Sequence, residues 1–551
     1  MKPGTHLMTN PATLSIFNHL FASVAEEMGV TLERAAYSPN IKERLDFSCA
    51  IFLGDGRLLA QAAHIPVHIG AMPASVKAAI AQCAPFAPGD VVILNDPYLG
   101  GNHLPDITIV SPVFIRSEMP RPTDIYPDPD FFVASRAHHA DVGGMSPGSM
   151  PLSTEIYQEG VIIPPLKIVE EGRRNTAVWK LILRNVRTPD ERQGDLAAQL
   201  AAHAIGEQRL RDIVARYGLE ETYKQGEALL AYAARLTAAA VAEMPDGVYQ
   251  FTDYLDSDGR SEEPVPIAVT MTINGDQMTV DFSGTAPAVK GNLNTVPAVV
   301  ESAVAYCVRC VALAQTGVDL PMNQGAYVPI TIKIPEGSLL NPRPPHAVAA
   351  GNVETSQRIT DVMFGALAQA LPNLVAAASQ GTMNNFTFGG RAPDGTHFAY
   401  YETIGGGIGA GPDNDGGHGM HAHMSNTLNT PIEALEYSFP LRVREYNLRQ
   451  GSGGNGQHTG GEGLIREVQF LVPVTATIMS ERRTRAPYGL QGGADGQPGR
   501  NIRHAADGTI ATLPGKITLD VEAGDTLRLE TPGGGGWGRE VSEKQEVKSK
   551  K

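Results

Sequence analysis

The sequence predicts a mixed α/β, multidomain fold with a glycine-rich, β-containing C-terminal half. Three observations support this prediction. The chain has 551 residues, which is more than a single hydrophobic core usually holds. Segments with helical periodicity alternate with short apolar runs typical of buried strands. From Gly381 onward glycine is frequent, and only short strands such as Val468–Val472 are recognisable.

The N-terminal region is expected to begin with an amphipathic helix and to continue as strands. Asn10-Pro11 is a helix start signal, and the apolar residues at steps of three and four that follow it end near Gly29. The Asp-Gly turn within Phe47–Leu59 predicts a hairpin. Further elements are expected at Val91–Leu94, Ile107–Phe114 and Phe131–Ser135 (strands) and at Ser117–Asp130 (a surface insertion).

The middle of the chain changes from helices to strands and back. Helices are expected at Asp195–Gly218, Gln225–Glu243, Pro297–Gln315 and Glu354–Leu371, and strands at Val248–Tyr249, Val265–Ile273 and Met278–Phe282. These changes predict an N-terminal α/β domain with the candidate metal site (1–194), a helical segment (195–245), an α/β domain (246–380), a glycine-rich β-containing domain (381–538) and a disordered tail (539–551).

Composition excludes several classes of protein. Lys and Arg number 44 against 59 Asp and Glu, a net charge of −15, which argues against nucleic acid or an anionic membrane as partner. Four cysteines are too few for a disulfide framework. The chain starts without a signal peptide and has no uninterrupted apolar run of about 18 residues, so we expect a cytoplasmic protein without a transmembrane helix.

Two loops at predicted strand ends carry the strongest chemical signal. The loops Asn95–Asp106 and Ala137–Gly144 contain His103, His138, His139, Asp96, Asp106 and Asp141. Imidazole and carboxylate groups suit Mn, Fe or Zn, and two histidines with one carboxylate leave open positions for water or substrate. Aspartate is also a common turn residue, so the spacing alone leaves an ordinary surface loop as an alternative.

Other polar loops are weaker candidates. His64 and His68 flank Pro66, and a glycine-rich loop, interpreted most simply as solvated, contains His418, His421 and His423. Gly351–Arg358 opens a predicted helix, whose N-terminus favours anions. Ser379–Asn385 is dense in amide donors. Ordinary helix capping explains these last two segments equally well.

Three apparent motifs are better explained in other ways. Gly451–Gly456 satisfies GxGxxG, but no βαβ unit surrounds it and no helix follows. The CxxC of Cys307 and Cys310 lies inside a predicted helix, where core packing is the simpler explanation. Gly515-Lys516 is not a phosphate-binding loop, because Ile517 replaces the required Ser or Thr. We therefore expect no nucleotide site in this chain.

Long motifs, in order along nearly the whole chain, resemble the hydantoinase B/5-oxoprolinase family. They are Ser38–Arg44, Asp46–Ala50, His103–Asp106, Ala137–Gly144, Gly351–Arg358, Ser379–Asn385, Gly451–Gly463, Glu481-Arg482 and Thr531–Gly538. The resemblance implies ATP-dependent opening of a small cyclic amide by a B-type subunit, in a hetero-oligomer with an A-type ATPase subunit that binds the ATP. In oxoprolinases both parts lie on one chain.

The resemblance also implies site residues. The large subunit of acetone carboxylase, a relative, holds manganese with an H-x-x-D pair and a later histidine, which fall on His103, Asp106 and His138. Manganese is therefore the expected metal, with zinc or iron as alternatives. The catalytic or supporting candidates are then His139, Asp141 and Asp96, because a metal-bound histidine needs an acceptor on its other nitrogen.

Three functions stay open at this point. The favoured one is the B-type subunit of a cyclic amide hydrolase, in which a metal-activated water attacks a ring amide phosphorylated by the partner, with His139 as general base. The alternative is the large subunit of an ATP-dependent ketone carboxylase of the acetone or acetophenone type, where the metal would stabilise an enolate. The third is a non-catalytic scaffold for the ATPase.

Overall fold

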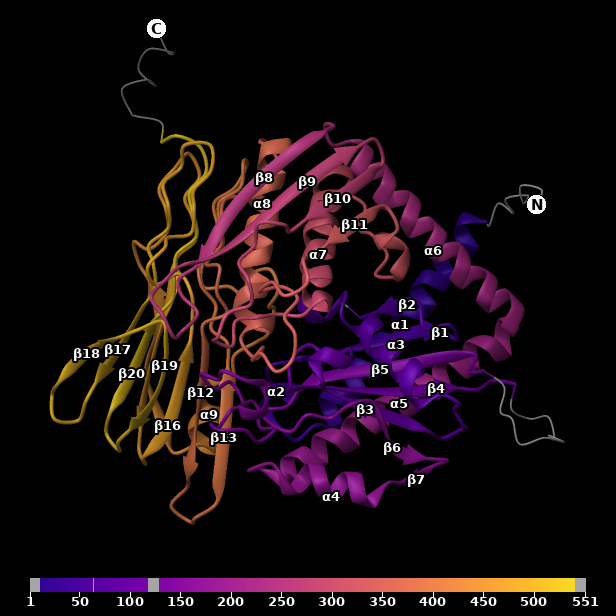
Figure 1. Cartoon of the computed structure of the whole chain (residues 1–551), viewed down its shortest axis with the longest axis horizontal. Helices are drawn as coiled ribbons and strands as arrows, with labels where there is room; N and C mark the ends of the chain where they lie inside the picture. The colour runs from indigo at the N-terminus through magenta and orange to yellow at the C-terminus, as the bar shows by residue number, and fades with distance from the viewer. Residues whose placement is uncertain (1–9, 63, 117–127, 541–551) are drawn as a thin grey trace, which may run out of the picture.

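The computed structural model describes residues 10–62, 64–116 and 128–540. Helices and four β-sheets make up this part of the chain. Figure 1 shows the N-terminal sheet on one side, the two C-terminal sheets on the other, and helices α7 and α8 with their small sheet between them. The predicted mixed α/β, multidomain fold class is confirmed.

The N-terminal sheet has seven strands in the order β2-β1-β5-β4-β3-β6-β7. Alternate residues of β1 pack into different clusters: Cys49 and Ile51 face helices α1 and α5, whereas Ala50 and Phe52 face α3. Because both faces are covered, strands β1, β2, β4 and β5 are buried along their whole length rather than at alternate residues. The elements are β1 (Phe47–Leu53), β2 (Leu58–Gln61), β3 (Val91–Leu94), β4 (Asp106–Val113), β5 (Phe131–His138), β6 (Leu166–Glu170), β7 (Arg173–Arg174), α2 (Pro39–Lys42), α3 (Met72–Cys83) and α4 (Thr176–Arg184).

Helix α1 (Pro11–Ala35) begins where the sequence predicts and ends later. The Asn10 side chain accepts a hydrogen bond from the Ala12 amide, which confirms the predicted cap. The predicted end near Gly29 is wrong. A Cβ at Gly29 would lie 2.5 Å from Cε1 of His64, so this glycine permits close packing within the helix and does not terminate it.

Helices α5 (Pro189–Tyr217) and α6 (Leu219–Ala242) follow one another across Gly218. Gly218 ends α5 as predicted, with a φ of 83° that a side chain would disfavour. Both helices start earlier than predicted, α5 at Pro189 with Asp190 and Glu191 in its first turn. Since α5 packs against α1 and β5, it covers the N-terminal sheet. The predicted domain boundaries stay predictions.

The middle of the chain combines a four-stranded sheet with two buried helices. The sheet order is β11-β10-β9-β8, and its inner face packs on α7 and α8 in one large core cluster. The predicted strands and helices are confirmed here, as β8 (Gly247–Leu255), β9 (Val265–Asn274), β10 (Gln277–Asp281), α7 (Pro297–Thr316) and α8 (Ser356–Ala370). Strand β11 (Ile330–Lys333) was not predicted. A π-helical turn, Gly351–Thr355, precedes α8.

Helix α7 is long and apolar enough to cross a membrane by length and composition alone. Half of its most apolar stretch is buried in the protein, and Cys307 and Val308 lie in the core cluster. A core helix of a soluble protein meets the same criteria, so this feature is weak evidence for a membrane span. The buried Cys307 also agrees with core packing of the CxxC segment.

The C-terminal half consists of two sheets that share one core. Their orders are β13-β12-β16-β19 and β14-β15-β20-β17-β18, and Phe388 of one meets Phe470 of the other with ring centroids 5.2 Å apart. The predicted strand Val468–Val472 belongs to a strand that ends at Phe470. The elements are β12 (Asn385–Arg391), β13 (His397–Glu402), α9 (Ile432–Ser438), β14 (Leu441–Arg449), β15 (Gly463–Phe470), β16 (Val474–Met479), β17 (Arg500–His504), β18 (Ile510–Leu513), β19 (Lys516–Val521) and β20 (Thr526–Glu530).

Glycine in this half lets backbone segments pack directly against one another. A Cβ at Gly453 would lie 2.0 Å from the carbonyl oxygen of Gly460, and one at Gly461 would lie 1.8 Å from that of Gly417. The GxGxxG match at 451–456 is therefore a consequence of close packing, and strand β15 follows it rather than a helix. The predicted insertion falls largely on residues 117–127, and most of the predicted tail on 541–551, both outside the described residues.

Candidate metal centre

The two loops with the strongest sequence signal meet at one edge of the N-terminal sheet. Strands β4 and β5 are antiparallel, and Asp106, which begins β4, pairs directly with His138, which ends β5. His103 lies in the loop just before β4. Because an antiparallel pair places the end of one strand beside the start of the other, residues 32 positions apart become neighbours.

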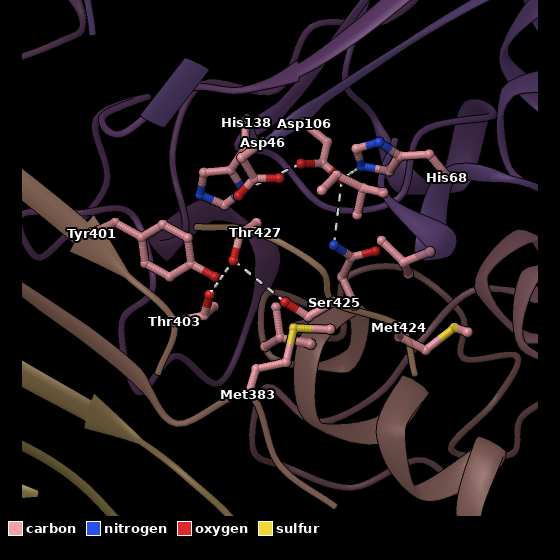
Figure 2. A pocket seen from close by; sticks show the side chains of 14 residues that line it. Asp46, His68, Asp106, His138, Met383, Tyr401, Thr403, Met424, Ser425 and Thr427 are labelled. Carbon is pink, nitrogen blue, oxygen red and sulfur yellow. Dashed lines mark hydrogen bonds and ion pairs between the residues drawn. The ribbon is translucent and has the colours of Figure 1, made fainter. Parts of the chain in front are cut away.

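Four polar side chains converge on the buried carboxylate of Asp106. His103 Nε2 lies 3.1 Å from Oδ1, and His138 Nδ1 lies 3.2 Å from the same oxygen. On the other oxygen, Oδ2, the contacts are His68 Nε2 at 3.2 Å and Asn352 Nδ2 at 3.3 Å. Figure 2 shows Asp106 between His138 and His68.

His103, Asp106 and His138 form a compact set of potential metal ligands. One ligand atom from each lies within 4.8 Å of the others, and all three side chains are buried. His138 donates through Nδ1 to Asp106, which leaves Nε2 with a lone pair. Among the described residues, that buried Nε2 has no hydrogen-bond partner. This donor set fits a divalent cation of the Mn, Fe or Zn type.

The orientation of His103 depends on two further contacts. Its Nδ1 donates to the carbonyl of Ala349 at 2.9 Å, which directs Nε2 toward Asp106. The backbone amide of Ala349 in turn donates to Oε1 of Glu159 at 3.0 Å. Such support behind a ligand fixes its tautomer and direction, so Glu159 positions His103 although it does not touch it.

The charges of this cluster depend on one another. Burial alone would lower the pKa of His103, but the adjacent Asp106 carboxylate outweighs it and the net pKa is raised. Burial alone would raise the pKa of Asp106, whereas His103, His68 and the hydrogen bonds hold it well below its usual range. Burial lowers the pKa of His138. The centre therefore retains an ionised carboxylate among imidazoles.

A small cavity opens on Asp106 and His138 from the C-terminal half. It encloses about 20 Å³, and its walls include His68, Asn352, Met383, Tyr401 and Met424. His103 lies behind this wall rather than on it. The ring of Tyr401 stacks on that of His138, with centroids 4.4 Å apart and planes 17° apart. Space of this size holds roughly one water molecule.

The other three sequence candidates make their contacts outside this cavity. The Asp96 side chain accepts from the Tyr98 amide at 2.9 Å and caps a short turn. Asp141 forms an ion pair with Arg187 at 2.8 Å. His139 Nε2 lies 3.2 Å from the side-chain oxygen of Gln199, and burial lowers the pKa of His139 to about 4.

The weaker sequence candidates divide between the centre and other places. His68 and the Gly351–Arg358 segment, through Asn352, do reach Asp106. The interpretation of the glycine-rich histidine loop as solvated is correct for exposed His418 and wrong for His421 and His423, which are half-buried. The Ser379–Asn385 segment is buried as well, and Asn385 Oδ1 accepts a hydrogen bond from Tyr401 at 2.9 Å.

Tyr401 and Glu159 were missed because nothing local marks them. Tyr401 lies in an ordinary strand, and Glu159 follows a short turn. A polar loop such as Gly351–Arg358 was a usable signal for Asn352. Only the folded chain shows that Asn352 contacts Asp106, that Tyr401 stacks on His138 and that Glu159 acts through Ala349 on His103.

Comparison with known proteins identifies the relatives of this chain. The family model described as hydantoinase B/oxoprolinase matches residues 10–540. The chain is 43% identical to 5-oxoprolinase 1 of Arabidopsis thaliana, over 96% of this chain and 42% of that protein. It is 32% identical to a Pseudomonas protein named as the B-type subunit of a D-/L-hydantoinase, over 98% of this chain and 91% of that one. The chain thus spans less than half the length of the oxoprolinase relative.

Two solved structures share the fold. The ATP-dependent caprolactamase of Pseudomonas jessenii superimposes with a TM-score of 0.87 at 26% identity, covering 98% of this chain and 94% of that one. Nucleotide-free acetone carboxylase superimposes with a TM-score of 0.86 at 20% identity, covering 96% of this chain and 76% of that one. The second likeness concerns the fold alone.

Proposed function

Because the chain belongs to the hydantoinase B/oxoprolinase family, we propose that it carries out the hydrolytic step of an ATP-dependent opening of a cyclic amide. The observation that carries this proposal is the buried set His103, Asp106 and His138. Two imidazoles and one carboxylate would hold a divalent metal, with manganese as first choice and zinc or iron as alternatives. When bound, such a metal lowers the pKa of water and polarises an amide carbon–oxygen bond.

The residues of this chain hold the reacting groups in a restricted space. Ala349 fixes the direction of His103, and the Tyr401 ring fixes the plane of His138. Asn352 donates to both Asp106 and His103, at 3.3 and 3.1 Å. The cavity of about 20 Å³ has room for roughly one water molecule, which is the size of the attacking nucleophile.

ATP is expected to bind outside the described residues. We found no nucleotide motif in the sequence, and the GxGxxG match is a packing feature. The length of the oxoprolinase relative favours a nucleotide-binding part joined to this one in a longer chain. The name of the hydantoinase relative favours a separate A-type subunit in a hetero-oligomer. In either arrangement, a resonance-stabilised ring amide becomes hydrolysable once its oxygen is phosphorylated.

The test combines metal content with product analysis. Wild type, His103→Ala and Asp106→Asn are assayed together with the ATP-binding part, on hydantoin, 5-oxoproline, a lactam, and a ketone with bicarbonate. His397→Ala, at an exposed position on β13, is the matched control. We expect ring-opened product and bound metal in wild type and control, and loss of both in the two ligand variants, with metal measured by mass spectrometry on the purified chain.

Other results would contradict the proposal. Carboxylated ketone instead of ring-opened amide would indicate the carboxylase alternative. Full activity in His103→Ala and Asp106→Asn, with no metal in any preparation, would leave only a scaffolding role for this centre.

A further inference from the structure

A second and larger cavity lies between helices α7 and α8 and the segment that follows α8. It encloses about 210 Å³, against about 20 Å³ at the metal centre. Its walls are formed by Val311, Phe364, Leu374, Val375, Ile408 and small alanines. An engineered apolar cavity of about 150 Å³ is sufficient to bind benzene, so this one has room for a ring-sized molecule.

The chemistry of the walls selects an uncharged ligand. Of the residues that line this cavity, none is Asp, Glu, Lys or Arg. Its polar groups are the thiol of Cys310, the hydroxyl of Ser379 and the imidazole of His423. Burial lowers the pKa of His423 to about 4, so the imidazole is neutral near pH 7. A charged ligand would lose its hydration without gaining an opposite charge.

His423 is held in place rather than left free. Its ring packs against those of Phe364 and Tyr306, with centroid distances of 5.3 and 5.9 Å. Its φ of 54° lies in the left-handed region, which residues other than glycine seldom adopt. These aromatic rings offer a flat apolar surface. A neutral imidazole has one donor and one acceptor nitrogen, and Nδ1 of His423 already lies 3.5 Å from the Tyr306 hydroxyl.

The same two segments separate this cavity from the small cavity at the metal centre. Ser379 and His423 line the large cavity, while Met383 and Met424, a few positions further along the same two segments, line the small one. Two of the residues that line the large cavity, Ala314 and Ala376, are exposed to solvent. A molecule can therefore enter from outside without disturbing the metal ligands.

We propose that this cavity is a binding site for a small, uncharged ring compound with hydrocarbon faces and one hydrogen-bonding group. The ring packs between the alanines of the mouth and the side chains of Phe364 and Val375. The polar group meets His423 or the Ser379 hydroxyl. This site is separate from the metal centre and requires neither metal nor nucleotide.

The test measures binding directly on the purified chain, without metal or ATP. The probe is ε-caprolactam, and cyclohexanecarboxylate is the charged control of similar size. Ala314→Trp places a large side chain at the mouth from an exposed position. Leu313→Trp is the matched control, because Leu313 is 44% exposed on the same helix and does not line the cavity.

We expect saturable binding of the lactam in ligand-observed NMR titrations, at least tenfold weaker binding in Ala314→Trp, and unchanged binding in Leu313→Trp. The carboxylate should bind at least tenfold more weakly than the lactam. Thermal melting of both variants checks that they fold equally. Absence of lactam binding to wild type, equal binding by Ala314→Trp, or equal binding of the carboxylate would each overturn the proposal. Since no turnover is measured, failure of the proposed hydrolysis would not affect the result.

Discussion

The stability of this protein should depend on pH in part through the buried carboxyl of Glu159. Burial also raises the pKa values of Glu354 and Asp361 to about 7, so Glu159 contributes one share of the total. Its Oε1 accepts hydrogen bonds from the Ser153 hydroxyl at 2.7 Å and from the amides of Val348 and Ala349 at 2.9 and 3.0 Å. Within the described part of the chain, the buried Oε2 has no partner. The perturbation is Glu159→Gln, which keeps the shape and the acceptor but cannot ionise.

The direction of the effect follows from the folded pKa. Burial raises the pKa of Glu159 from 4.5 to about 7, against the opposing hydrogen bonds from Ser153 and the two amides. Between these values the folded protein retains a proton that the unfolded chain has released. The contribution of Glu159 to stability is therefore greatest below about pH 4.5, falls as the pH rises to about 7, and is level above that. A pKa raised from 4.5 to about 7 changes the free energy of unfolding by at most about 3 kcal/mol.

The assay is urea unfolding of wild type and Glu159→Gln from pH 4.5 to 8. The chain has two tryptophans, and Trp179 packs in the same cluster as Ile156, close to Glu159 in sequence. In a Trp537→Phe background, fluorescence therefore reports on this region. The variant should show a shallower decline than wild type and gain up to about 3 kcal/mol relative to it above pH 7.

The control is Glu155→Gln, which removes an exposed carboxylate from the same loop. It should show the same decline as wild type. If Glu159→Gln also declines in parallel with wild type between pH 4.5 and 7, another group causes the pH dependence and the role assigned to Glu159 is wrong.

Two further predictions concern packing. Tyr401→Phe keeps the ring on His138 but leaves the buried Asn385 Oδ1 without its 2.9 Å donor, so urea unfolding should show a loss of about 1–3 kcal/mol. The control Tyr437→Phe, at a side chain that is 93% exposed, should change stability by less than about 0.5 kcal/mol. If both variants lose the same stability, the hydrogen bond from Tyr401 to Asn385 does not stabilise the fold as stated. Gly29→Ala should cost about 1–3 kcal/mol, because its methyl group meets His64 at 2.5 Å. Adding His64→Ala should recover part of that loss in a double-mutant cycle, and an additive result would refute the contact.

Much of the fold was predictable because its signals are local. The Asn10 cap, the turn between β1 and β2 and the buried strand runs follow from residues within a few positions of one another. The predictions failed where a contact between residues distant in sequence determines the local structure. In the sequence Gly29 resembles the end of a helix. In the structure it lies within the helix, where the His64 ring from another segment leaves no room for a Cβ. The early start of α5 was readable from Pro189 and the acidic residues after it.

The candidate site was predictable only in part, for the same reason. His103, Asp106 and His138 stand out because two loops rich in histidine and aspartate follow predicted strands. Asn352 lies 246 positions from Asp106 in the sequence and still contacts it. No periodicity or spacing rule links residues so far apart in the sequence. They become neighbours only when the chain folds. Whether His139, Asp96 or Asp141 takes part in the reaction stays a prediction.

Arg44 explains how the two halves of the chain build one site. Its guanidinium is fully buried and donates to the Tyr401 carbonyl at 2.7 Å and to the Thr403 hydroxyl at 3.0 Å, while the Tyr401 ring lies 4.9 Å below it. A buried cation needs such partners, because leaving it unpaired costs several kcal/mol. Separating the turn before β1 from β13 while Arg44 stays buried would leave its charge without these partners. Since β13 also carries Tyr401 onto His138, this contact between the two halves lies beside the candidate metal centre.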